Sequence, residues 1–197
     1  MIQESLVYQP LCDVRVVDVG QGCIVRLPKD ARYIALSNIW VTDSADHFPT
    51  LCSKIDRLSL PGSLKKTNLP LMIMNAITVC KELECRYLWV DRFCIIQDEV
   101  DANSTQLKQM ASLYHHAIFI IVAATGYSAT YGLSGVNRAR DKQEYIKLQG
   151  GLEIVESVPN LNTALSSSKW NERGWTYQEH VSSLDLLLFT KYGIYVE

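Results

Sequence analysis

Apolar and polar residues follow two periods along the chain, and each period predicts a different kind of element. Residues 13–27 are β-branched and partly alternating around two glycines, which predicts a hairpin. Residues 33–38 read as a strand, and residues 87–91 form a short apolar strand that ends in an acid. Residues 117–124 are continuously apolar, which is typical of a strand covered on both faces.

Helical spacing starts at Pro70, a residue suited to a first helical turn. The apolar residues that follow recur every three or four positions and predict a helix of about four turns. A second amphipathic helix is predicted around residues 107–114. The polar, proline-containing stretch 42–68 predicts a variable connection, with one short helix near residues 52–58.

The last third of the chain predicts two further strand pairs. Residues 145–148 and 152–155 flank a Gly-Gly pair, which is a strong hairpin signal. We expect residues 170–182 to be helical and residues 184–196 to form a closing pair of strands. Because this strand pattern continues to the last residue, we expect the sequence to be a piece of a longer protein.

The order strand, helix, strand, helix, strand predicts an α/β fold: a mainly parallel sheet flanked by helices, with added β-hairpins. We expect residues 1–32 to form an N-terminal hairpin extension packed on a domain of residues 33–197. Ligands of such sheets bind outside the carboxyl ends of the strands. Polar residues at 38–40, 91–97 and 125–126 are therefore expected to meet at one edge.

Composition narrows the class of protein. The chain has 197 residues, of which 48% are hydrophobic, so one domain can bury a core without disulfides or metal. The net charge is −2 and the Lys and Arg residues are dispersed, so the chain has no positive potential that would attract nucleic acid or an anionic membrane. Neither a signal peptide nor a membrane span is evident, which favours a cytoplasmic location. The six cysteines form no C-x-x-C pair, and we expect reduced, mostly buried thiols and no metal site.

Three blocks of sequence, in order, resemble the fungal heterokaryon-incompatibility (HET) family. They are YIALSNIW at 33–40, the long segment 69–135 around YLWVDRFCIIQDE, and WNERGWTYQEHVSS at 170–183. The resemblance implies an intracellular fungal protein that recognises non-self at cell fusion and causes regulated cell death. The family is also remotely similar to Toll/interleukin-receptor (TIR) domains, some of which cleave NAD, and this implies a TIR- or flavodoxin-like core.

The chain departs from the family pattern at four positions. Asn38 stands where the family usually has Tyr, Val41 where it has Gly, Asn75 where it has Asp, and Arg92 where it commonly has Ser. Two of these departures fall in the first block, at the expected ligand edge. A diverged member that has lost its activity is therefore one of the alternatives.

The third block carries the candidate catalytic residue. Helical spacing puts Trp175 beside Glu179 and Arg173 beside Tyr177. Cleavage between ribose and nicotinamide passes through an oxocarbenium-like state, which the Glu179 carboxylate would stabilise while an aromatic face stacks on the base. The alternative is that Trp175 belongs to the core and Glu179 forms a structural ion pair.

Other residues are candidates for binding NAD as a substrate: Trp40, Asp91 and Gln97 at the strand ends, together with Arg173 and Trp175. Asp91 has an alternative role, which is to accept backbone N–H bonds and start the following turn. Cys94 is expected to be a buried thiol and not a nucleophile, since no motif pairs it with a histidine. The sequence shows neither a dinucleotide fingerprint nor a phosphate-binding loop, so no cofactor is expected.

Two function hypotheses from different classes remain open besides an inactive member. The first is a TIR-like NAD glycohydrolase with Glu179 as its catalytic carboxylate. The second is a non-enzymatic signalling module that associates with copies of itself or with other incompatibility proteins. Under either hypothesis we expect no nucleic acid, membrane or metal among the partners.

Overall fold

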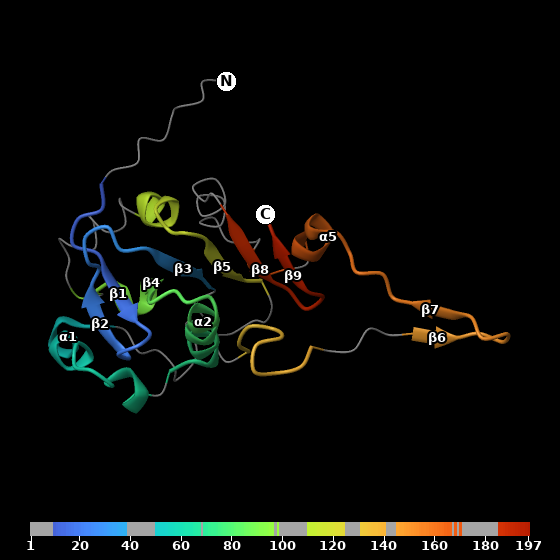
Figure 1. The fold of residues 1–197 in the computed structure, drawn as a ribbon, viewed down its shortest axis with the longest axis horizontal. Coiled ribbons are helices and arrows are strands. Elements are labelled where there is room, and N and C mark those ends of the chain that lie inside the picture. Colours follow the sequence, from blue (N-terminus) through green and yellow to red (C-terminus); the bar gives the residue numbers. More distant parts are fainter. Residues whose placement is uncertain are drawn as a thin grey trace, which may run out of the picture.

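The computed structural model describes a large part of the chain: residues 10–38, 50–67, 69–96, 98, 110–124, 131–140, 145–166, 168, 170 and 185–197. Figure 1 shows a body built around one twisted sheet and a two-stranded hairpin, β6 Tyr145–Lys147 and β7 Glu153–Val155, that extends away from this body.

The main sheet has seven strands in the order β2-β1-β4-β3-β5-β8-β9. Their bounds are β1 Arg15–Asp18, β2 Cys23–Arg26, β3 Tyr33–Ser37, β4 Tyr87–Val90, β5 Ile120–Ala123, β8 Leu186–Phe189 and β9 Ile194–Val196. These strands agree closely with the stretches that alternation and apolar runs predict. The expected strand pairs at both ends of the chain are therefore confirmed.

Four neighbouring strands at the centre of the sheet are parallel, because β3 pairs in parallel with β4 and β5, and β5 pairs in parallel with β8. Every residue of β3 and β5 is buried. Such double-sided burial explains why residues 117–124 are continuously apolar, since a strand covered on both faces has no solvent-facing position to make polar.

The expectation of a mainly parallel sheet is corrected by the three remaining pairs. β1 lies antiparallel to both β2 and β4, and β9 lies antiparallel to β8. The sheet is therefore mixed. β2 follows β1 and β9 follows β8 through short turns, and a tight turn can join only antiparallel strands. The β1–β4 pair has no such turn, and β1 joins β4 from a distant part of the sequence. A TIR- or flavodoxin-like core stays a prediction.

In the described part of the chain, helices are few and mostly short. They are α1 Cys52–Leu58, the 3-10 turn η1 Leu64–Lys66, α2 Leu71–Glu82, α3 Asp91–Cys94 and α5 Leu161–Ser166, and residues 110–115 are also helical. The two helices predicted at residues 52–58 and after Pro70 are confirmed as α1 and α2. Pro70 is the residue immediately before the first turn of α2, which packs against β4 and buries one face.

A buried carboxylate fastens the β1–β2 hairpin to the centre of the sheet. Asp18 Oδ1 accepts hydrogen bonds from the backbone N–H groups of Gly20 (3.0 Å) and Gln21 (2.9 Å). Its Oδ2 accepts from Arg86 Nε at 2.9 Å, just before β4 begins. Burial by itself would raise the pKa of Asp18, but these donors and the Arg86 charge outweigh it and lower the pKa below its usual 3.8.

We predict that Asp18→Asn destabilises the fold by roughly 1–2 kcal/mol, because the turn keeps an acceptor while the charged bond to Arg86 is lost. A lowered folded pKa means that ionised Asp18 stabilises the native chain above pH 3.8 and that this contribution disappears as pH falls through the folded pKa. Urea unfolding at several pH values would measure both effects.

The matched control is Asp13→Asn, which removes an exposed ion pair with Arg26 in the same hairpin and should change stability little. An equal effect of the two substitutions, or an Asp18→Asn deficit that persists unchanged at low pH, would contradict this role.

A second anchor joins α2 to the loop that precedes β6. The side-chain Oδ1 of Asn75 accepts a hydrogen bond from Leu133 N at 2.9 Å, and both residues are buried. Gly132 has a positive φ of 76°, and a Cβ there would lie 2.4 Å from this oxygen. The close approach therefore requires glycine.

We predict that Gly132→Ala destabilises the chain by at least about 1 kcal/mol more than Gly62→Ala. Gly62 has the same φ of 76° but nothing within 4 Å of an added Cβ. This control isolates backbone strain, and the difference reports the clash with Asn75. Equal melting-temperature shifts in calorimetry would refute the close-approach argument.

Candidate functional site

The carboxyl ends of the four parallel strands lie along one edge of the sheet. The register places Leu36 opposite Val90, and Ser37 opposite Val122. Ala123 in turn lies opposite Phe189. This is the edge at which open α/β sheets bind ligands.

A buried side-chain hydrogen bond joins two distant parts of the chain at this edge. Trp170 Nε1 donates to Ser37 Oγ at 2.7 Å, across 133 positions of sequence. Both residues are 1% exposed. Ser37 belongs to the first sequence block and Trp170 opens the third, so these two blocks meet in space. The periodicity of the sequence did not predict this contact, because the indole and the hydroxyl belong to segments that are far apart in sequence.

Asp91 is the candidate binding residue that lies within the described part of the chain. It follows directly after β4 and begins α3, at the same edge as Ser37. Its Oδ1 accepts the backbone N–H of Arg92 at 2.6 Å. This is the geometry of the structural alternative, in which Asp91 starts the following turn. The side chain is half-buried, and contact with a ligand stays a prediction.

Polar side chains are concentrated at this edge. Asn38 is 4% exposed and Arg92 is 2% exposed, and both are positions where the chain departs from the family pattern. Together with Asp91 they place an amide, a guanidinium and a carboxylate directly after the parallel strands β3 and β4, and contact with a ligand stays a prediction.

The other candidate residues lie outside the described residues: Trp40, Gln97, Arg173, Trp175 and Glu179. The structure therefore does not place the proposed catalytic carboxylate. What it does place is Trp170, the first residue of the block that contains Glu179.

Asp98 caps the N-terminus of α1, although it lies 46 positions further along the sequence. Its Oδ1 accepts the backbone N–H of Cys52 at 2.7 Å, at the start of α1. The residue preceding this helix, Leu51, offers no side-chain cap of its own. The hydrogen bond from Cys52 N lowers the pKa of Asp98, as expected for a carboxylate at a helix N-terminus.

Cys94 is a buried thiol, as expected. It is 2% exposed, and burial raises its pKa to about 12 despite the backbone N–H of Val90 that lies 3.3 Å from its sulfur. A thiol with so high a pKa stays protonated at neutral pH and is a poor nucleophile. All six cysteines are free, and four of them are buried.

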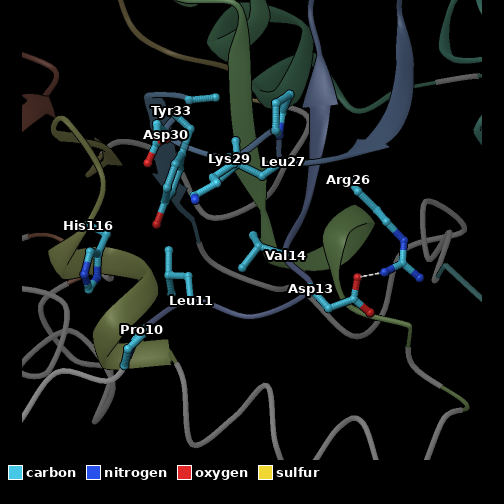
Figure 2. A pocket seen from close by; sticks show the side chains of 12 residues that line it. Pro10, Leu11, Asp13, Val14, Arg26, Leu27, Lys29, Asp30, Tyr33 and His116 are labelled. Atoms are coloured by element: carbon cyan, nitrogen blue, oxygen red, sulfur yellow. Dashed lines mark hydrogen bonds and ion pairs between the residues drawn. The ribbon is translucent and has the colours of Figure 1, made fainter.

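A pocket of about 710 Å³ lies between the start of β3 and the segment that leads into β1 (Figure 2). Its wall includes the apolar side chains of Leu11, Val14 and Leu27. Figure 2 shows His116 and Tyr33 at one end and the Arg26–Asp13 ion pair at the other. Because these residues come from the N-terminal segment and a distant helix, the sequence pattern did not predict the pocket.

Among the described residues, no group of three or more His, Cys, Asp or Glu side chains is arranged to hold a metal ion. None of the helices in these residues has the length and apolar character needed to cross a membrane.

Comparison with known proteins identifies the family of this chain. The family model described as "Heterokaryon incompatibility protein (HET)" matches residues 33–179. The chain therefore belongs to the heterokaryon-incompatibility family.

One similar protein is "Heterokaryon incompatibility protein 6, OR allele" of Neurospora crassa, with 25% identity over 100 residues. The match covers 46% of this chain but 14% of that protein, so the chain spans a small part of its relative's length. No solved structure matches the chain.

We predict that the Ser37–Trp170 hydrogen bond couples the first and third blocks energetically. Ser37→Ala leaves a buried indole N–H without this acceptor and should cost about 1–3 kcal/mol. In a double-mutant cycle with Trp170→Phe, we expect a coupling energy of about 1 kcal/mol, measured by chemical denaturation.

Tyr195→Phe is the control partner for this cycle, because Tyr195 lies on β9, three strands away from β3. Its effect should add to that of Ser37→Ala within about 0.5 kcal/mol. Strict additivity in the Ser37–Trp170 cycle would mean that the bond contributes nothing to holding the blocks together.

Proposed function

We propose that this chain acts in fungal heterokaryon incompatibility, as a module that responds to non-self and triggers regulated cell death. Membership of the family supports the incompatibility role, as does the similarity to an incompatibility protein of Neurospora crassa. The structural observation that carries the proposal is the Ser37–Trp170 hydrogen bond, because it brings the first and third family blocks to the ligand-binding edge of an α/β sheet.

The reaction we propose is hydrolysis of NAD to nicotinamide and ADP-ribose. The bond between ribose C1′ and the nicotinamide nitrogen breaks, nicotinamide leaves with the bonding electrons, and water adds to C1′ with release of a proton. Because the leaving group already carries positive charge, it departs as a neutral molecule without a general acid. The Glu179 carboxylate stabilises the positive ribose in the transition state.

The remaining candidate residues would bind the substrate at the same edge. Trp175 stacks on a base, Arg173 faces the phosphates, and Trp40, Asp91 and Gln97 complete the pocket. The helix predicted for residues 170–182 rises about 14 Å between Trp170 and Glu179. Trp170 is held at Ser37, and a site at the strand ends requires this helix to run along that edge. The order of the four parallel strands, β4-β3-β5-β8, supports a flavodoxin-like ligand site beside β3.

The second candidate is a signalling module without a reaction of its own. Exposed aliphatic residues on β6 and β7 favour it, since a large apolar patch marks a surface for association. The chain would then activate a separate death effector, and its partners would be further copies or other incompatibility proteins.

We predict that the purified chain releases nicotinamide from NAD and that Glu179→Gln lowers the rate by about 100-fold or more, because the substitution removes the stabilising charge and keeps the shape. Glu82→Gln, at the exposed end of α2, is the matched control and should keep full activity. Chromatography of the reaction mixture measures nicotinamide, and circular dichroism checks that each variant is folded.

Equal release by Glu179→Gln and the wild type would remove Glu179 from the chemistry. If the wild type releases no nicotinamide even when it self-associates, the signalling module or an inactive member replaces the enzyme. Asn38→Tyr combined with Val41→Gly then separates these two, since restored release identifies a member inactivated by its changed first block.

A further inference from the structure

The pocket of Figure 2 is lined by residues that the proposed reaction does not use. Its volume of about 710 Å³ lies within the roughly 300–1,000 Å³ of small-molecule sites. Tyr33 begins β3 and lines this pocket, whereas Ser37 ends the same strand and binds Trp170. The pocket and the candidate site therefore use different residues, and what binds in the pocket is a question of its own.

Hydrogen bonds to the neighbouring helical turn fix one end of the pocket. The Tyr33 hydroxyl donates to Leu113 O, and burial raises the pKa of Tyr33, so the phenol keeps this proton. His116 Nδ1 lies 2.7 Å from Ser112 O. Because a carbonyl oxygen only accepts, this ring nitrogen carries the proton and Nε2 is the acceptor of the neutral ring. The Tyr33 oxygen and His116 Nε2 are thus both acceptors.

Two side chains of opposite charge, Lys29 and Asp30, line the pocket on the side of Tyr33, as Figure 2 shows. Arg26 and Asp13, at the other end, neutralise one another in an ion pair. No such pair joins Lys29 or Asp30 to another side chain in the described part of the protein. The Tyr33 end therefore offers an ammonium group as a donor and a carboxylate as an acceptor.

A tight turn sets the positions of these two charges. Lys29 and Asp30 are its central residues, and Ala31 N donates to Pro28 O at 3.1 Å to close it. Asp30 has a φ of 62°, at a turn position that favours glycine. The Asp30 carboxylate is thus held at a strained backbone position, and such positions are concentrated at ligand-binding sites.

The middle of the pocket is apolar. Leu11, Val14 and Leu27 line it between the two polar ends (Figure 2). All three are partly buried and pack against the core, so their positions are set by the fold. They offer a surface to the apolar part of a ligand whose polar group lies at the Tyr33 end.

We propose that this pocket binds a small zwitterionic molecule with an apolar body, the chemical class of the aromatic and branched-chain amino acids. Its carboxylate accepts from the Lys29 ammonium group, and its own ammonium group donates to the Asp30 carboxylate and to the acceptors at the pocket end. A simple anion would leave Asp30 without a partner and meet its repulsion, and a simple cation would meet that of Lys29. Since both side chains are exposed, each charged contact is weak, and we expect millimolar affinity.

The first test is an NMR titration of the full chain with three probes that share a phenyl group: L-phenylalanine, phenylpropionate and phenethylamine. The second probe lacks the ammonium group and the third lacks the carboxylate. We expect L-phenylalanine to shift the amide signals of residues that line the pocket, and to bind at least about threefold more tightly than either analogue.

Two variants assign each charge to its partner. Lys29→Gln should remove the preference for L-phenylalanine over phenethylamine, and Asp30→Asn should remove the preference over phenylpropionate. Asparagine tolerates a positive φ, so the second variant keeps the turn. The matched controls are Lys81→Gln and Glu82→Gln, an exposed neighbouring pair of the same charges on α2, and both should bind L-phenylalanine as the wild type does.

The proposal is wrong if L-phenylalanine causes no shifts at the pocket, if either analogue binds the wild type as tightly, or if the Lys29 and Asp30 variants behave as the controls do. Binding of phenylpropionate alone would make the pocket an anion site, which also contradicts it. The inference does not rest on the proposed reaction, since release of nicotinamide is measured separately and uses none of these residues.

Discussion

The parallel pairing of β3 with both of its neighbours is the constraint on which the rest of the structure depends. All five residues of β3 are buried, and its backbone is hydrogen-bonded to β4 on one side and β5 on the other. Parallel strands cannot be joined by a tight turn, so the chain must leave each central strand at the same edge and cross back before the next one. Residues that follow different strands therefore meet at that edge, however far apart they are in sequence.

The outer strands of the sheet pair antiparallel, unlike the four central strands. The β1–β2 hairpin adds antiparallel to β4, and the Asp18–Arg86 interaction holds its turn at the opposite edge from the candidate site. At the other side β9 folds back on β8. Short turns join β1 to β2 and β8 to β9, so each hairpin extends the sheet by antiparallel pairing.

Three features with different chemistry occur in this small protein. The carboxyl edge of the central strands contains the buried Ser37–Trp170 bond, a partly apolar pocket lies between the start of β3 and the Asp13–Arg26 ion pair, and the β6–β7 hairpin carries exposed aliphatic side chains.

Local periodicity was enough to determine most elements. Residues 52–58 form α1 as their spacing predicts, and the apolar run 117–124 contains the buried β5. These predictions succeed because the side-chain period reports backbone geometry and burial within one element. The family blocks were likewise readable from residues alone and identified the segments expected at the site.

Only the tertiary structure decided how these elements join. The antiparallel addition of β1 to β4 made the sheet mixed, and hydrogen bonds linked Trp170 to Ser37 and Cys52 to Asp98 across 133 and 46 positions. A donor and an acceptor so far apart leave no periodic signal in either segment. Their pairing is determined by which strands lie side by side, and that depends on the packing of the whole core.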